Sequence, residues 1–258
     1  MLKNKVAVIY GAGGAIGGAV ARAFAAEGAM LFLSGRHLAP VEAVARDVAA
    51  AGAAAVDALD EQAVDTHLQS VINEAGRVDI SFNAVGIPNS EILGVPLADL
   101  GVELFTLPIL TYARSYFLTA RHAARHMVPN RSGVIMTVTA LHSRTGIALV
   151  GGYGPAMAAK EALTRDLSAE LAPHGIRVVG LRPQAVPETR TIKEAFEPRA
   201  KASGMTWEQW QEFLAGRTHA RRLMTLEEIA NVAVLMASEK ASGMTGTIVN
   251  LTMGSLDD

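Results

Sequence analysis

Short runs of Val, Ile and Leu alternate with longer amphipathic segments along nearly the whole chain. Strands buried on both faces are continuously apolar and crossover helices have a period of 3.6, so this alternation predicts a doubly wound parallel sheet with helices on both faces. The expected strands are residues 6–10, 29–34, 53–56, 79–83, 133–138, 176–181 and 247–251. The expected helices are residues 16–27, 40–51, 61–75, 105–127, 155–172 and 226–238. The sequence therefore predicts an α/β sheet of seven strands.

Composition narrows the classes of protein and the locations to consider. With 258 residues, half of them hydrophobic, the chain suits a single domain over residues 1–258. Its formal charge of −2 favours neither nucleic acid nor a membrane as a partner, and the absence of cysteine excludes disulfides and thiolate chemistry. Residues 6–21 superficially resemble a signal peptide, but their five glycines would each weaken such a helix by about 1 kcal/mol. We expect a cytoplasmic protein.

The strand and helix alternation stops between residues 184 and 224, in a charged amphipathic stretch that contains both tryptophans. The spacing of Trp207, Trp210 and Phe213 places all three near one helical face. Two interpretations remain open. The insertion is either a lid over a substrate pocket or a helix that packs this face on the body of the protein.

The first expected strand runs into a glycine-rich turn, YGAGGAIGG (10–18). Glycine allows a tight turn and a close approach of phosphate to backbone N–H groups at the next helix N-terminus. The spacing is not the G-x-G-x-x-G of many dinucleotide-binding proteins. It resembles the T-G-x3-G-x-G segment of the short-chain dehydrogenase/reductase superfamily, with Tyr10 in place of threonine and Ala15 in place of the middle glycine.

Further segments extend this resemblance over nearly the whole chain: NAVG (83–86), DLSAELAPHGIRV (166–178) and TLEEIANVAVLMAS (225–238). The resemblance implies a Rossmann fold, an oxidoreductase activity on a small-molecule substrate, and a homotetramer or homodimer formed through the helices at 105–127 and 155–172. The cofactor-binding residues that it implies are Gly11, Gly14, Ile16, Gly17, Arg36, Asp57, Asn83, Ala84, Lys160 and Pro183.

The end of the second strand, SGR (34–36), indicates which nicotinamide cofactor is used. The family contacts the adenosine ribose there, and no carboxylate is present to accept from a 2′-hydroxyl. Arg36 can bind a 2′-phosphate in a bidentate manner. We therefore expect NADP(H) rather than NAD(H), with Asp57 near the adenine.

Four active-site positions depart from typical members of the family. Ala140 occupies the position of the serine that holds the substrate oxygen, and Thr139, His142 or Ser143 are possible substitutes. Ala156 lies four residues before Lys160, where the tyrosine is usual. Tyr112 replaces the helix asparagine, and Gln184 replaces the glycine of Pro-Gly after the sixth strand.

Tyr153 lies seven residues before Lys160, and this Y-x6-K spacing resembles the divergent branch typified by bacterial enoyl-acyl carrier protein reductases. We expect the helix to begin at Pro155 and Tyr153 to fold back from a glycine-rich loop. The resemblance assigns proton donation to Tyr153 and ribose binding to Lys160, whose ammonium group eases release of the phenol proton.

The resulting prediction is an NADP(H)-dependent oxidoreductase that reduces a carbonyl or a carbonyl-conjugated double bond. Because Ala140 and Ala156 remove typical active-site groups, the alternative is a catalytically inactive nucleotide-binding protein that acts as a sensor or scaffold. No metal site is expected, since the pair His122 and His126 has no carboxylate near it in the sequence.

Overall fold

Seven parallel strands form one sheet in the order β3-β2-β1-β4-β5-β6-β7, which confirms the predicted fold class. This computed structural model describes residues 1–87 and 93–256, without the side chains of residues 190, 191, 195, 198, 199 and 202. The strands are β1 (Val6–Tyr10), β2 (Met30–Gly35), β3 (Gly52–Ala55), β4 (Ile80–Asn83), β5 (Gly133–Val138), β6 (Ile176–Pro183) and β7 (Thr247–Leu251).

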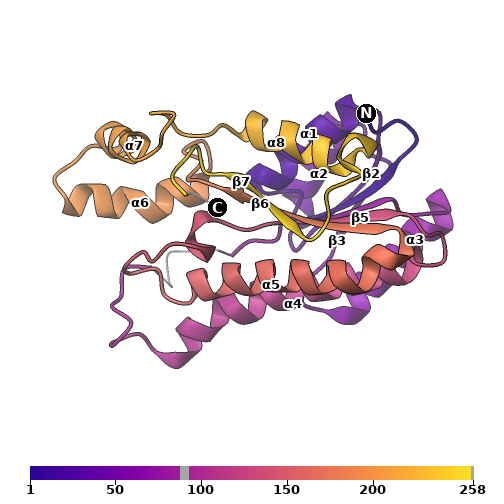
Figure 1. Cartoon of the computed structure of the whole chain (residues 1–258), viewed down its shortest axis with the longest axis horizontal. Coiled ribbons are helices and arrows are strands. Elements are labelled where there is room, and N and C mark those ends of the chain that lie inside the picture. Colours follow the sequence, from indigo (N-terminus) through magenta and orange to yellow (C-terminus); the bar gives the residue numbers. More distant parts are fainter. Residues whose placement is uncertain (88–92, 257–258) are drawn as a thin grey trace.

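Helices cover both faces of the sheet (Figure 1). They are α1 (Ala15–Ala26), α2 (Leu38–Asp47), α3 (Glu61–Ala75), α4 (Val102–Met127), α5 (Tyr153–Leu171), α6 (Arg190–Ala202), α7 (Trp207–Gly216) and α8 (Leu226–Ala237). Successive side chains of a strand point to opposite faces. In β1, Ala7 and Ile9 therefore join the core beneath α1 and α8, whereas Val8 and Tyr10 join the core beneath α3, α4 and α5.

The strand order reverses at the pair β1 and β4, because β2 and β3 extend the sheet on one side of β1 and β5 extends it on the other. In such sheets the ligand crevice lies at this switch point, beyond the carboxyl ends of the strands. Figure 1 shows α6 and α7 projecting beyond the same edge. The topology therefore places the predicted cofactor and substrate residues at one edge of the molecule.

The second helix is shorter than predicted, since α2 ends at Asp47 and the predicted helix ran to residue 51. Gly52, which lay outside both predicted elements, begins β3, and a Cβ atom there would lie 2.8 Å from Cδ1 of Phe32. Glycine is suited to that position because Phe32 lies across it.

The insertion is helical and forms α6 and α7. Thr206 begins α7 with a capping box, in which its hydroxyl accepts from the backbone N–H of Gln209 and the Gln209 side chain accepts from the Thr206 N–H. The ring of Trp210 lies 6.2 Å from that of Phe196 and 5.4 Å from that of Phe213. The contact with Phe196 joins α7 to α6, whereas Phe213 lies on α7 itself. The role of the two helices as a lid stays a prediction.

Candidate active site

The glycine-rich turn after β1 has the backbone that phosphate binding requires. Gly11 has a φ of +78°, and a Cβ atom at Gly17 would lie 2.3 Å from the carbonyl oxygen of Gly11. Gly14 is the N-cap of α1 and, as a glycine, has no side chain that could cap that helix start. The first turn, which includes the half-buried Ile16, carries no acidic residue. Unbonded amides at a helix start favour an anion.

Arg36 and Asp57 lie on neighbouring segments at the carboxyl edge of the sheet. Their strands β2 and β3 end beside each other, with Gly35 paired to Ala55 and the Val56 N–H bonded to the Gly35 carbonyl at 2.9 Å. Both side chains are exposed, and Asp57 Oδ1 accepts from the Leu59 backbone N–H at 2.9 Å. The guanidinium group of Arg36 therefore stands at the carboxyl edge of β2, open to a ligand.

The ends of β4 and β6 complete this edge. Asn83 is buried and donates through Nδ2 to Thr119 Oγ1 at 3.1 Å, whereas its buried Oδ1 has no partner in the part of the chain that the structure describes. Ala84 follows, with its N–H bonded to the Tyr10 carbonyl, and Pro183 is the buried last residue of β6. An uncapped glycine turn and an orphaned amide oxygen at one crevice fit a bound dinucleotide.

The structure corrects the predicted start of the fifth helix. Tyr153 is the first residue of α5 and not part of a folded-back loop, with Gly152 as the N-cap. Pro155 is the third helical residue. Proline is tolerated there because the first N–H groups of a helix have no intrahelical acceptor. A Cβ atom at Gly152 would lie 1.9 Å from the Phe105 carbonyl oxygen, so this glycine allows the close approach of α5 to α4.

Tyr153 and Lys160 therefore share one helix face about two turns, roughly 10 Å, apart. The space between them is occupied by Tyr112, a buried residue of α4. The Tyr112 ring centroid lies 5.7 Å from that of Tyr153 and 5.6 Å from Lys160 Nζ. Tyr112 packs with Ala140 and Ala156, whose small side chains leave room for it. Tyr112 thus fills the space that the two small alanine side chains leave open.

Burial shifts the titration of the tyrosines and of the lysine. Loss of solvation, followed by the proximity of Tyr112, raises the pKa of Tyr153, so its phenol stays protonated at neutral pH. Lys160 is buried, and its Nζ donates to the Val138 carbonyl at 2.7 Å. Loss of solvation lowers the pKa of Lys160 to about 7. The site therefore holds a neutral phenol and an amine that titrates near physiological pH.

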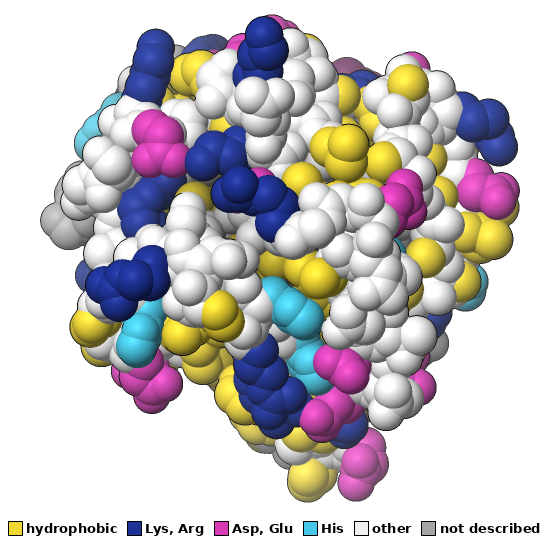
Figure 2. Space-filling view, turned by 90° about the vertical axis from the view of Figure 1, so that its right-hand side faces the viewer, with side chains coloured by type: hydrophobic (Ala, Val, Ile, Leu, Met, Phe, Trp, Pro, Cys, Tyr) yellow, Lys and Arg dark blue, Asp and Glu magenta, His cyan; other side chains and the backbone are white. Residues whose placement is uncertain are grey.

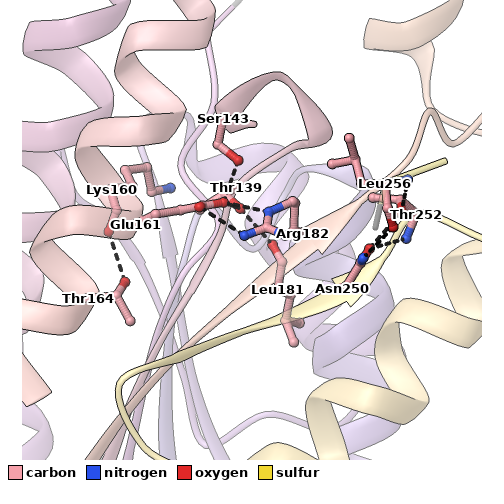
Figure 3. A network of polar contacts seen from close by, with 10 residues as sticks. All are labelled: Thr139, Ser143, Lys160, Glu161, Thr164, Leu181, Arg182, Asn250, Thr252 and Leu256. Atoms are coloured by element: carbon pink, nitrogen blue, oxygen red, sulfur yellow. Dashed lines mark hydrogen bonds and ion pairs between the residues drawn. The ribbon is translucent and has the colours of Figure 1, made fainter. Parts of the chain in front are cut away.

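A buried carboxylate links β5, α5 and β6 beside these residues (Figure 3). Glu161 accepts from Arg182 at 2.8 Å (Nε) and 3.0 Å (Nη2), from Thr139 Oγ1 at 3.0 Å and from Ser143 Oγ at 2.5 Å. Burial opposes the ionisation of Glu161, but the hydrogen bonds from Arg182, Ser143 and Thr139 outweigh it and hold its pKa below the ordinary value. Sequence reasoning missed this pair, although an arginine within the apolar strand β6 was its signal.

His142 lies between Thr139 and Ser143 in the chain, on the short 3₁₀ turn η1 (Leu141–Ser143) that follows β5. It is half-buried, and its ring centroid lies 5.1 Å from that of Tyr153 at an interplanar angle of 80°. Tyr153 is thus in edge-to-face contact with two rings, His142 on one element and Tyr112 on another.

His122 is buried, and its Nδ1 lies 2.9 Å from Oδ1 of Asp65 on α3. The sequence analysis considered only neighbours in the chain, and the structure adds this carboxylate from a different helix. Within the described ranges, no group of three or more His, Cys, Asp and Glu side chains is arranged to hold a metal ion. Nor is any helix of those ranges long and apolar enough to cross a bilayer.

A cavity of about 270 Å³ lies on the opposite side of the sheet from this site, at the amino ends of β4, β5 and β6. Its charged groups are already engaged: Lys5 pairs with Glu239, Asp79 pairs with Arg77, and Arg177 donates to the Met236 and Ser238 carbonyls. Figure 2, which faces the right-hand side of Figure 1, shows basic and acidic side chains interspersed. The carboxyl edge remains the candidate site.

The fold and this edge define a dinucleotide-binding α/β protein with a tyrosine and a lysine beside the cofactor crevice. Residues 11–255 match the family model described as Enoyl-(Acyl carrier protein) reductase, and the chain belongs to the short-chain dehydrogenase/reductase superfamily. The predicted family resemblance is confirmed.

Relatives of known name support the same assignment. The chain is 30% identical to an uncharacterized oxidoreductase, YxjF, of Bacillus subtilis (strain 168), over 98% of each chain. It is 27% identical to 7alpha-hydroxysteroid dehydrogenase of Escherichia coli (strain K12), over 100% of this chain and 96% of that one. The structure of an NAD+-bound xylitol dehydrogenase superposes with a TM-score of 0.88 at 25% identity, covering 97% of this chain and 98% of that one. The chain is therefore an oxidoreductase of this superfamily, which uses a nicotinamide dinucleotide.

Proposed function

We propose that the chain catalyses NADP(H)-dependent reduction of a carbonyl, or of a double bond conjugated to a carbonyl, in a small or medium-sized molecule. The observation that carries this proposal is the position of Tyr153, a half-buried phenol at the start of α5, at the carboxyl edge of the sheet. Its raised pKa keeps the proton available for transfer to an oxygen.

Each residue has a separate role in this proposal. The bound cofactor supplies the hydride. Tyr153 donates its proton to the oxygen on which negative charge develops. Lys160 in its ammonium form stabilises the resulting phenolate and binds the nicotinamide ribose, and the adjacent Tyr112 ring contacts both side chains. Gly11, Gly14, Ile16 and Gly17 cradle the pyrophosphate, while Asp57 contacts the adenine, and Asn83, Ala84 and Pro183 border the nicotinamide half.

The preference for NADP(H) rests on Arg36, which is exposed at the end of β2 with no carboxylate at the position where the ribose is expected. An Arg36→Ala variant should lose affinity for NADPH by about tenfold or more, because a charge-assisted bidentate contact is removed, and should keep its affinity for NADH. Equal affinities of the wild-type protein for the two cofactors in a fluorescence titration would contradict this preference.

The catalytic assignment is tested by NADPH oxidation on a panel of ketones, aldehydes and enones. Tyr153→Phe should lower kcat by about 10²–10⁴, the usual contribution of general acid catalysis. Tyr112→Phe is the matched comparison, since it removes the same hydroxyl from the neighbouring ring. Full turnover by both Tyr153→Phe and Lys160→Ala would remove the proposed roles. NADPH binding without turnover across the panel would favour the alternative, a catalytically inactive sensor or scaffold.

We also propose that two or four copies of the chain associate through α4 and α5. Phe117 is 41% exposed beside an apolar groove of about 500 Å³, which Val128 and Leu171 also line and which Arg121 and Glu170 flank with opposite charges. A second copy would cover this surface, on which Arg121 already pairs with Glu61 of its own chain. Light scattering of the wild type and of Phe117→Glu tests the assembly, and a monomeric wild type would refute it. A cytoplasmic location and the lid role of residues 184–224 belong to the same proposal.

A further inference from the structure

The amine of Lys160 lies in an enclosed site, although the proposed function needs its charged form at the nicotinamide ribose. The side chain is only 1% exposed, and burial disfavours an ammonium group. Glu161 is the next residue in the chain, but successive residues of a helix do not share a face, and Glu161 forms its ion pair with Arg182. The positive charge of Lys160 therefore needs another source of stabilisation.

Two tyrosine rings of α4 lie against this amine. Lys160 Nζ lies over the ring of Tyr112, 5.6 Å from its centroid, and over the ring of Tyr116, 5.7 Å from its centroid. Both distances are within the range of about 6 Å in which the negative face of an aromatic ring attracts a cation. The tyrosines are four residues apart, so they project from one face of α4. With the Val138 carbonyl, which accepts from Nζ at 2.7 Å, three electron-rich groups surround the ammonium group.

Hydrogen bonds of the two phenols fix the orientation of these rings. The Tyr112 hydroxyl accepts from the Ile87 backbone N–H at 3.4 Å, in the segment that follows β4. The Tyr116 hydroxyl lies 3.1 Å from Thr164 Oγ1, which itself donates to the Lys160 carbonyl at 2.9 Å (Figure 3). Since Thr164 has given its single proton, Tyr116 is the donor to it. The hydroxyl groups thus anchor both rings beside Lys160.

We propose that Tyr112 and Tyr116 form a cation–π clamp, which keeps the Lys160 amine protonated and holds it in place for the nicotinamide ribose. Both tyrosines are positioning residues, since they act through Lys160. The effect of the clamp on turnover rests on the proposed function, whereas its effect on the ammonium group does not. Removing the attraction of one ring for the cation, while keeping the size of the ring, should make Lys160 easier to deprotonate.

Fluorinated rings separate this role from packing, because fluorine withdraws charge from the face of a ring and changes its size little. The proteins compared, without cofactor, are Tyr112→Phe and Tyr112→pentafluorophenylalanine, with the same pair at Tyr116 as an independent repeat. The pKa of Lys160 is measured by carbon-13 NMR of labelled lysine, and its resonance is the one lost in Lys160→Met. Fluorination should lower this pKa by about one unit relative to phenylalanine at the same position. Fluorination of Phe24, which is buried beneath α1 and α8, is the control and should not shift it.

The direction of the shift is decisive, because looser packing would admit water and raise the pKa of Lys160. The other ionisable groups around this amine are the same in each compared pair: Tyr153 and Glu161 on α5, and His142 of η1 against Tyr153. A pKa that is unchanged or higher in the fluorinated variants at both positions overturns the clamp.

Turnover gives the second readout. With NADPH and whichever ketone or enone the wild type reduces, the decline of kcat/KM at high pH should move to lower pH by the same amount as the pKa of Lys160. A lower pKa without this movement overturns the role of the clamp in turnover. An absence of NADPH oxidation by the wild type overturns the reductase function instead, and the NMR titration still supports or refutes the clamp.

Discussion

The pair Glu161 and Arg182 supports the sharpest stability prediction, because both side chains are at least 96% buried. The perturbation is Glu161→Gln, which keeps the shape of the side chain and removes its charge. Two of the four hydrogen bonds to this carboxylate come from the guanidinium group. In the variant, an amide NH2 group replaces one acceptor oxygen and faces these donors. The buried cation of Arg182 then loses the counter-charge that Glu161 supplies.

Breaking a buried ion pair from one side costs about 3–5 kcal/mol, because the remaining charge is desolvated without compensation. A protein of this size loses about 2–4 °C of Tm per kcal/mol, so Tm should fall by about 6–20 °C. In the wild type, the contribution of the ionised Glu161 to the free energy of unfolding depends on pH. Since the folded-state pKa of Glu161 is lowered, the stabilisation is present above the pKa of an unfolded glutamate and is lost as pH falls through the folded-state value.

The assay is urea unfolding of the wild type, Glu161→Gln, Arg182→Met and the double variant Glu161→Met with Arg182→Met. The double variant removes both charges and should recover at least half of the loss, since apolar residues of similar volume often replace a buried pair at little cost. A Glu161→Gln variant that loses less than about 1 kcal/mol would refute the reasoning. So would a double variant that is less stable than Glu161→Gln.

Three further predictions concern residues outside this pair. Tyr10→Phe should raise the unfolding free energy by about 1 kcal/mol and Tm by about 2–4 °C, because the buried Tyr10 hydroxyl has no hydrogen-bond partner in the described part of the chain; a lower Tm would contradict this. Gly17→Ala should weaken NADPH binding at least tenfold in a fluorescence titration, and more than Gly14→Ala, since the added Cβ atoms would lie 2.3 and 3.3 Å from the Gly11 carbonyl oxygen; equal losses would argue against the phosphate cradle. Lys160 has a pKa of about 7 in the folded state and 10.5 as an ordinary lysine, so the unfolded state binds more protons between these values. The wild type should therefore gain stability with rising pH relative to Lys160→Met, by up to about 1.4 kcal/mol per pH unit in urea unfolding; parallel pH curves would show that burial does not depress this pKa.

Most of the fold could be predicted from patterns of neighbouring residues. The period of the apolar residues predicted all seven strands and six of the helices, because strand and helix periodicities are properties of neighbouring residues. Errors arose where a glycine had a tertiary reason, as at Gly52 beside Phe32 and at Gly152 beside the Phe105 carbonyl. A glycine that allows two distant segments to approach cannot be told from a glycine that ends a helix by its neighbours in the chain.

The family resemblance indicated which edge of the sheet to examine, and the order of the strands placed Gly11, Arg36 and Asn83 there. It did not indicate how the departures fit together. Ala156 and Tyr112 are 44 positions apart, and only the packing of α5 on α4 shows that the ring of one occupies the space beside the other.

From the sequence alone, three nearby donors remained equivalent candidates for the position left empty by Ala140. Tertiary structure shows that Glu161, brought from the middle of α5, accepts hydrogen bonds from two of them, Thr139 and Ser143. Backbone conformation and burial patterns are encoded over a few neighbouring residues, so the parallel sheet and its glycine turn could be predicted from the order of the residues. Hydrogen-bond partners and ring contacts join residues that are distant in the chain, so only the folded structure decided which side chain faces Tyr153.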